Sequence, residues 1–277
     1  MKRILTSITG ILLLSLGMPA HAAITGQWQF DGDYSPQIGS AIVPQGTAVS
    51  GSVFGTTTSF GLPAIGGQVA QVMMFPKVLT TADGYQMFPG AAANGSTSDV
   101  NQYSLIMDIL YPSASTGFRG LFQTSAGNAN DADWFVNGSN GIGSNGGYNG
   151  NLTADTWHRI ALVVDLEQTD TTKKYLNYID GAFVGYSVLR STENAPGGRY
   201  ALYPEGSGKP SWIFSDNDGE TALGYVNSVQ FRDYAMTASE VAGLGGPSAV
   251  GIPEPGSGLL LAAGMALLLA RASRRSK

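Results

Sequence analysis

The five residues Asp216-Asn217-Asp218-Gly219-Glu220 are the densest acidic group in the chain. Carboxylate oxygens at alternating positions around a glycine turn suit a hard cation such as Ca²⁺, which takes six to eight oxygen ligands. Lysine and arginine are absent between Lys209 and Arg232, so no basic residue nearby in sequence neutralises the turn. The pattern favours a calcium site made by the three carboxylates of the turn. The full spacing of an EF-hand loop is missing, and an exposed acidic turn without a metal is the alternative.

A second oxygen-rich segment runs from Asn128 to Asp133, with asparagine or aspartate at four of its six positions. It is a weaker candidate for the same cation. Asp31 and Asp33 are weaker partners still, because they would have to reach the turn from a distant loop.

Three aromatic residues, Trp134, Tyr148 and Trp212, lie near predicted turns. An exposed aromatic ring can stack on the apolar face of a sugar, so these residues are candidates for ligand stacking. Packing in the core or at its rim is the alternative for each of them.

The chain offers little for nucleophilic or redox catalysis. It has no cysteine, which excludes disulfides, iron–sulfur clusters, cysteine-based zinc sites and thiol nucleophiles. One of its two histidines, His21, lies in a predicted signal peptide. The other, His158, has no nucleophile motif near it, and we interpret it as a packed or half-buried structural histidine.

These candidates belong to a chain in which most segments alternate apolar and polar residues, the pattern of β-strands. Tyr103 to Tyr111 and Trp157 to Leu166 each place apolar residues on one face, and Asp180-Gly181 fits the tight turn of a hairpin. Predicted strands are 27–30, 69–75, 103–111, 120–124, 157–166, 175–179, 182–188, 212–215 and 224–232.

Helix signals are nearly confined to 237–244, where Thr237 and Glu240 form a capping box and Gly245 can end the helix. The glycine- and asparagine-rich segments 90–98 and 138–151 are predicted loops. We therefore expect an all-β fold, a two-sheet antiparallel sandwich over residues 23–246 with one short C-terminal helix, followed by a spacer at 247–252.

Residues 1–22 carry the features of a secretory signal peptide: Lys2 and Arg3, an apolar run, and the small-x-small pattern Ala20-His21-Ala22. We expect signal peptidase to cut before Ala23. The apolar run is too short to span a membrane comfortably, which disfavours the alternative of a permanent anchor.

Residues 253–277 combine the triplet Pro253-Glu254-Pro255, the apolar run 256–270 and a basic tail containing Arg271, Arg274 and Arg275. These three parts, in this order, resemble the PEP-CTERM sorting signal. The resemblance implies that a transmembrane helix anchors the precursor transiently in the inner membrane. An exosortase then removes the tail and releases the protein to the cell surface or extracellular matrix. A permanent C-terminal anchor is the alternative.

Removal of both ends leaves nine basic residues against 20 acidic ones, a net charge of −11. Such a protein repels nucleic acid and anionic membranes and attracts divalent cations. We therefore expect no nucleic-acid partner.

The order of elements resembles the laminin-G-like, or concanavalin A-like, jelly-roll domains. The matching segments are 28–31, 103–105, 157–161, 178–181, 225–229 and 244–246. The resemblance implies sugar or protein binding, often with calcium, in a mostly non-catalytic family. Enzymes of this architecture typically carry Glu-x-Asp-x-x-Glu, which is absent here. We expect an exported, non-catalytic module that binds glycans or an exopolysaccharide matrix. The alternatives are a polysaccharide hydrolase or lyase and a purely structural matrix protein.

Overall fold

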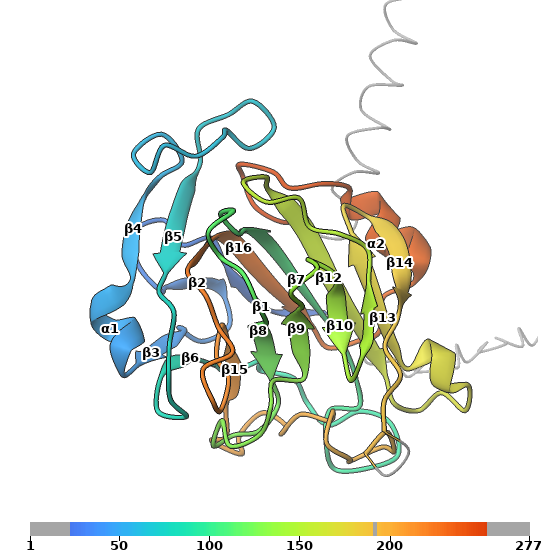
Figure 1. The fold of residues 1–277 in the computed structure, drawn as a ribbon. Coiled ribbons are helices and arrows are strands. Elements are labelled where there is room, and N and C mark those ends of the chain that lie inside the picture. Colours follow the sequence, from blue (N-terminus) through green and yellow to red (C-terminus); the bar gives the residue numbers. More distant parts are fainter. Residues whose placement is uncertain (1–22, 191–192, 254–277) are drawn as a thin grey trace, which may run out of the picture.

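A computed structural model describes residues 23–190 and 193–253, which form two antiparallel sheets packed face to face (Figure 1). The predicted all-β sandwich with a short C-terminal helix is confirmed. Every stretch that we predicted to be a strand overlaps an observed strand.

The first sheet has nine strands. In pairing order seven of them are β14 (Ala182–Tyr186), β13 (Tyr175–Ile179), β12 (His158–Asp165), β7 (Gln102–Leu110), β16 (Gly224–Arg232), β1 (Ile24–Trp28) and β2 (Pro36–Ile38). Off this path, β5 (Gln71–Phe75) pairs with β16, and β4 (Val53–Thr56) pairs with β5.

The second sheet has seven strands. In pairing order they are β11 (Gly147–Asn149), β10 (Ile142–Ser144), β9 (Trp134–Val136), β8 (Arg119–Gln123), β15 (Ser211–Ile213), β6 (Gly84–Met87) and β3 (Val43–Gln45). The helical elements are α1 (Thr47–Gly51), the 3₁₀ turn η1 (Thr171–Lys173) and α2 (Ala238–Leu244).

The main core lies between the two sheets and contains the apolar faces that strand alternation predicted. On β7 the inward set includes Leu105 and Met107, and on β12 it includes Leu162 and Val164. Because successive side chains of a strand point to opposite faces, the intervening residues lie on the outer face.

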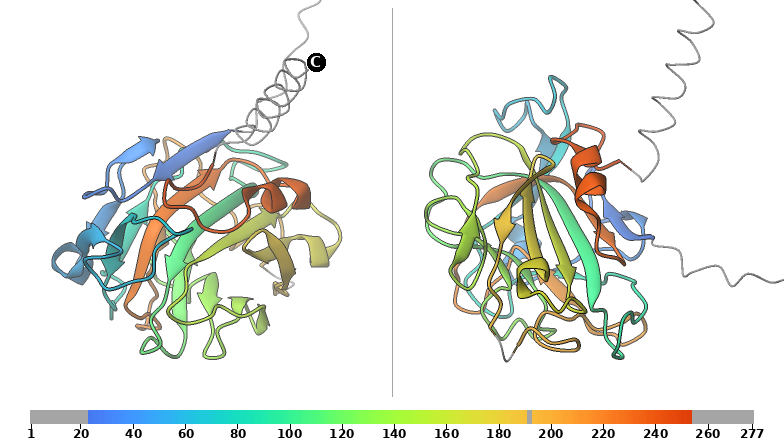
Figure 2. Two further views of the ribbon diagram at one scale, coloured as in Figure 1. Left: turned by 90° about the horizontal axis from the view of Figure 1, so that it is seen from above. Right: turned by 90° about the vertical axis from the view of Figure 1, so that its right-hand side faces the viewer.

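The outer face of the central strands β7, β12 and β16 is covered rather than solvated. Helix α2 lies on it (Figure 2) and packs Val241 into a second apolar cluster with Ile106 and Ala161. The helix begins with the predicted capping box, in which the Thr237 hydroxyl accepts from the backbone N–H of Glu240 and the Glu240 carboxylate accepts from the N–H of Thr237. Residues on both faces of these strands are therefore buried.

The segment 247–253, which we call the strap, continues this cover. Arg159 donates to the carbonyl oxygens of Leu244 and Gly251 at 2.6 and 3.3 Å, and the side chain of Ile252 is 3% exposed. The segment was predicted to be a spacer, but it packs on the sandwich because buried polar groups of the sheet bond its backbone.

The segment 138–151, predicted to be a loop, contains β10 and β11, so that prediction was wrong. Its glycines permit a close approach: a Cβ on Gly143 would lie 2.0 Å from the carbonyl oxygen of Gly147 on the paired strand. The turn at Asp180 and Gly181 is confirmed, with φ values of 50° and 81°.

His158 is bonded at both ring nitrogens, as a structural histidine is. The backbone N–H of Thr153 donates to Nε2 at 3.0 Å, so Nδ1 carries the proton and donates to Asp180 at 2.8 Å. The half-buried position predicted for His158 is confirmed.

Several predictions fall outside the described residues: the signal peptide with Ala20 and Ala22, and the tail from Glu254 onward. Within the described part of the chain, no helix is long and apolar enough to span a membrane.

Candidate calcium and aromatic site

The acidic turn follows β15 and lies beside β8, where the backbone N–H of Gly120 donates to the carbonyl oxygen of Glu220 at 2.7 Å. One carboxylate oxygen from each of Asp216, Asp218 and Glu220 lies within 4.8 Å of the others. Asp216 is buried, whereas Asp218 and Glu220 are exposed. The structure therefore brings together the three residues that the sequence nominated, with two of them open to solvent.

Asp216 organises the turn. Its Oδ1 accepts from the backbone N–H of Ala132 at 2.8 Å, and its Oδ2 accepts from the N–H groups of Asp218 and Glu220 at 3.2 and 3.3 Å. Burial, together with the neighbouring Asp218, raises the pKa of this carboxyl to about 6. Proton binding at Asp216 therefore competes with cation binding near neutral pH.

The second oxygen-rich segment adjoins the acidic turn, because Ala132 belongs to it. Burial, then the charges of Asp218 and Asp131, raise the pKa of the Glu220 carboxyl. No ion pair formed by residues 23–190 and 193–253 involves any carboxylate of the acidic turn. Asp131, Asp216, Asp218 and Glu220 thus share one region, and none of their carboxylates forms an ion pair within the described part of the chain.

The donor set fits Ca²⁺. All its candidate ligands are oxygens, and the amide oxygen of Asn217, within the turn, is buried without a hydrogen-bond partner among the described residues. Asp31 and Asp33 are not in the group that the acidic turn forms.

Tyr148 is the predicted stacking residue that lies near this site. Burial, and then the charges of Glu220 and Asp131, raise the pKa of its hydroxyl to about 12. Its ring packs edge-on against Phe118, with centroids 5.6 Å apart, and Phe118 packs in the same way on Phe135. Phe118 is 39% exposed. Phe118 was not among the residues predicted to stack on a ligand, although it is an aromatic residue just before the predicted strand 120–124.

The other two predicted stacking residues are buried, and for them the prediction was wrong. Trp134 is fully buried in the main core, where its indole N–H donates to the side-chain oxygen of Asn177 at 2.9 Å. Trp212 is 5% exposed and donates to the carbonyl oxygen of Ala126. Neither ring has a face free for a ligand.

No family model and no curated protein matches this sequence. Among solved structures, domain 4 of AbnA, an extracellular arabinanase from Geobacillus stearothermophilus, in complex with arabinotriose, is 16% identical. The match covers 80% of this chain and 97% of that one, with a TM-score of 0.47.

Two further matches are more partial. The receptor-binding domain of botulinum neurotoxin type G is 10% identical over 80% of this chain and 50% of its own, with a TM-score of 0.45. Trypanosoma rangeli sialidase in complex with the inhibitor DANA is 12% identical over 62% of this chain and 28% of its own, with a TM-score of 0.38. Such identities and scores say nothing about what this protein binds.

Proposed function

We propose that this protein is a non-catalytic glycan-binding module, and that the acidic turn with Tyr148 and Phe118 is a calcium-assisted binding site. The observation that carries the proposal is the grouping of three carboxylates, one of which, Glu220, is near enough to raise the pKa of Tyr148, the ring partner of Phe118. A bound Ca²⁺ would neutralise the carboxylates and offer coordination positions to sugar hydroxyl groups. The rings of Phe118 and Tyr148 would contact the apolar face of the same sugar.

The burial of Asp216 excludes it from a hydrolytic carboxylate pair, so the reducing-end assay below has to test the exposed pair Asp218 and Glu220. Glycoside hydrolysis needs two carboxyl groups that reach opposite sides of the scissile bond. Asp216 is fully buried and its two oxygens accept three backbone N–H groups. It can orient the turn or contact a metal, but it does not reach a polysaccharide.

Calcium binding is tested by thermal unfolding of the chelator-treated protein with added CaCl₂. A ligand that binds only the folded state stabilises it by about 2.7 kcal/mol at a hundredfold excess over Kd. The Tm of the wild type should rise, and that of Asp218→Asn and Glu220→Gln should rise much less. Asp31→Asn removes an exposed carboxylate elsewhere and serves as the charge-matched control.

Glycan binding is tested with an array of matrix polysaccharides, with calcium and with EDTA, followed by a reducing-end assay on each glycan retained. Retention that needs calcium and is lost in Glu220→Gln and Phe118→Ala supports the proposal. If reducing ends accumulated with the wild type but not with Glu220→Gln, the protein would be a hydrolase and the non-catalytic proposal would be wrong. Absence of both retention and cleavage would favour a purely structural matrix protein.

We also propose that the chain is exported and matures at both ends. The backbone nitrogen of Ala23 donates to Asp233 Oδ1 at 2.7 Å. Cleavage before Ala23 would place the new ammonium group beside this carboxylate, which supports the proposed cleavage position. Intact-mass analysis from a host with the sorting enzyme should show a chain that starts at Ala23 and lacks the basic tail.

A further inference from the structure

A second candidate site lies around Tyr203. Two cavities, of about 370 and about 280 Å³, share Tyr203 as a lining residue. We call them together the Tyr203 groove. Tyr203 is 40% exposed, and its ring is absent from the aromatic pairs formed within residues 23–190 and 193–253. Packing in the core does not explain this ring.

The backbone holds Tyr203 in place on both sides. Leu202 exchanges two hydrogen bonds with Val100, at 2.8 and 3.0 Å, and the N–H of Glu205 donates to the carbonyl oxygen of Ala91 at 2.7 Å. The ammonium group of Lys209 lies over one face of the ring, 4.1 Å from its centre, so a stacked ligand would use the opposite face. A ring held in this way loses little conformational entropy when a ligand stacks on it.

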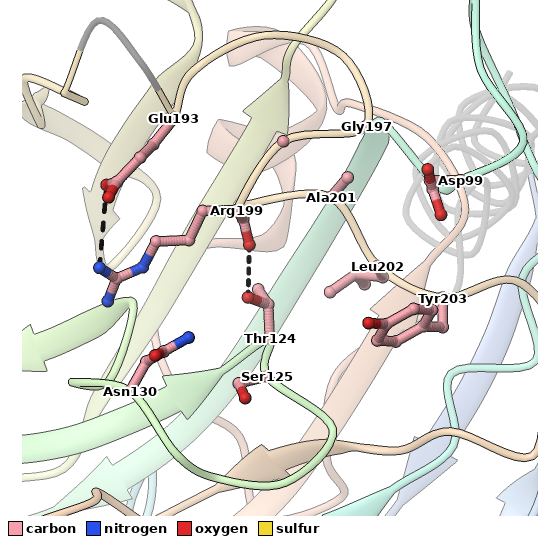
Figure 3. A pocket seen from close by; sticks show the side chains of 11 residues that line it. Asp99, Thr124, Ser125, Asn130, Glu193, Gly197, Arg199, Ala201, Leu202 and Tyr203 are labelled. Atoms are coloured by element: carbon pink, nitrogen blue, oxygen red, sulfur yellow. Dashed lines mark hydrogen bonds and ion pairs between the residues drawn. The ribbon is translucent and has the colours of Figure 1, made fainter.

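Charged side chains line the larger cavity at both ends. Asp99 lies near Tyr203 at one end, and Glu193 and Arg199 lie at the other (Figure 3). The Arg199 guanidinium is fixed by the buried carboxylate of Asp133 at 2.7 Å. The Glu193 Oε2 atom is buried, lies 3.8 Å from Arg199 and has no hydrogen-bond partner among the described residues.

Charge decides the class of ligand. Arg199 forms ion pairs with both Asp133 and Glu193, so one positive charge faces these two carboxylates and that of Asp99, and the larger cavity carries a net negative charge. The smaller cavity holds one acid and one base, Glu205 and Lys209. An anionic polysaccharide would be repelled from the larger cavity, whereas the hydroxyl groups of a neutral sugar can donate to its carboxylates and accept from Arg199.

We propose that the Tyr203 groove is a saccharide-binding site for a short neutral oligosaccharide, with one sugar ring stacked on Tyr203. The inference extends the proposed glycan-binding function to a second site whose residues are distinct from the acidic turn. The two sites adjoin one loop: Asn130 lines the groove, and Ala132 bonds Asp216. Two sites on one loop let a polysaccharide bind bivalently, which raises its apparent affinity.

The test is calorimetric titration in EDTA with cellotriose, maltotriose and arabinotriose as neutral probes and trigalacturonate as the anionic probe. Wild-type protein should bind at least one neutral probe, and Tyr203→Ala should weaken that binding at least tenfold. Tyr186→Ala is the matched control, since Tyr186 is 39% exposed and lies on strand β14, outside both cavities, and it should retain the wild-type affinity. Asp99→Asn, with the ring intact, should also weaken binding.

The inference would be overturned if none of the three neutral probes bound, if wild type and Tyr203→Ala bound equally well, or if the protein preferred trigalacturonate. Circular dichroism and the Tm of each variant establish that it is folded. The calcium-induced rise in Tm, measured on Tyr203→Ala, reports the acidic turn separately. A protein with no calcium response but Tyr203-dependent binding would refute only the proposed calcium site.

Discussion

The Asp108–Arg159 pair and the acidic turn both place carboxylates beside a sheet, but only the first neutralises its carboxylate with an ion pair. Asp108 accepts from Nε and Nη2 of Arg159, both at 2.7 Å, and both side chains are at most 2% exposed. The strap covers the pair, and the backbone N–H of Ser248 adds a further hydrogen bond to Asp108. In the acidic turn, by contrast, Asp218 and Glu220 are exposed, and no ion pair of the described residues includes them.

In the covered pair, burial goes with neutralisation by an opposite charge, whereas Asp216 in the acidic turn is buried without an ion pair among the described residues, and its pKa is raised instead. A buried charge is tolerated only when a partner and additional hydrogen bonds replace the lost water. The Arg159 guanidinium meets this condition through its bonds to Asp108, Leu244 and Gly251. The acidic turn keeps contact with solvent, from which a cation can supply the missing charge.

The largest effect should come from breaking the covered pair. Asp108→Ala leaves the Arg159 charge buried without its partner, and we expect a loss of about 3 to 5 kcal/mol in the free energy of unfolding. Urea denaturation measures it. Lys173→Ala, which breaks the solvent-exposed pair with Asp170, is the control and should have little effect. Equal losses in the two variants would mean that burial does not distinguish the pairs.

Removing the strap should have the next largest effect. A chain that ends at Gly246 loses the burial of Ile252 and the carbonyl partner that Gly251 gives to Arg159. Compared with a chain that ends at Pro253, we expect it to be less stable by about 3 kcal/mol. If the two chains unfold at the same urea concentration, the strap does not stabilise the covered pair.

The third effect is a pH dependence of stability that comes from Asp216 in the acidic turn. The pKa of Asp216 is raised above its unfolded value, so this group adds stability that is present at low pH and lost as pH rises through about 6. Between about pH 7.5 and pH 5, in EDTA, wild type should gain about 1 kcal/mol more than Asp216→Asn. The comparison of slopes is independent of any overall destabilisation by the substitution. Parallel pH profiles would contradict it.

The smallest effect is expected at the margin of the covered sheet. A chain that starts at Ala23 pairs its ammonium group with Asp233, and Asp233→Asn should cost at most about 1 kcal/mol. The loss should shrink at high salt and in a chain that begins one residue earlier. A salt-independent loss would show that the hydrogen bond matters and the charge does not.

Patterns that act over a few residues were readable from the sequence. Strand alternation identified the inner faces of β7 and β12, the capping box identified α2, and Asp180-Gly181 identified the hairpin. The acidic turn was readable for the same reason, since its three carboxylates lie within five residues. Each feature depends on backbone geometry that neighbouring residues determine.

Contacts between distant strands were decided only by the tertiary structure. Trp134 and Tyr148 both lie near glycine- and asparagine-rich segments, yet pairing buries Trp134 in the core and leaves Tyr148 beside Glu220. The cover over Asp108 depends on Ser248, 140 residues away in the sequence. No local pattern encodes such proximity, because a side chain's neighbours across a sandwich follow from sheet order and register, which the whole chain determines together.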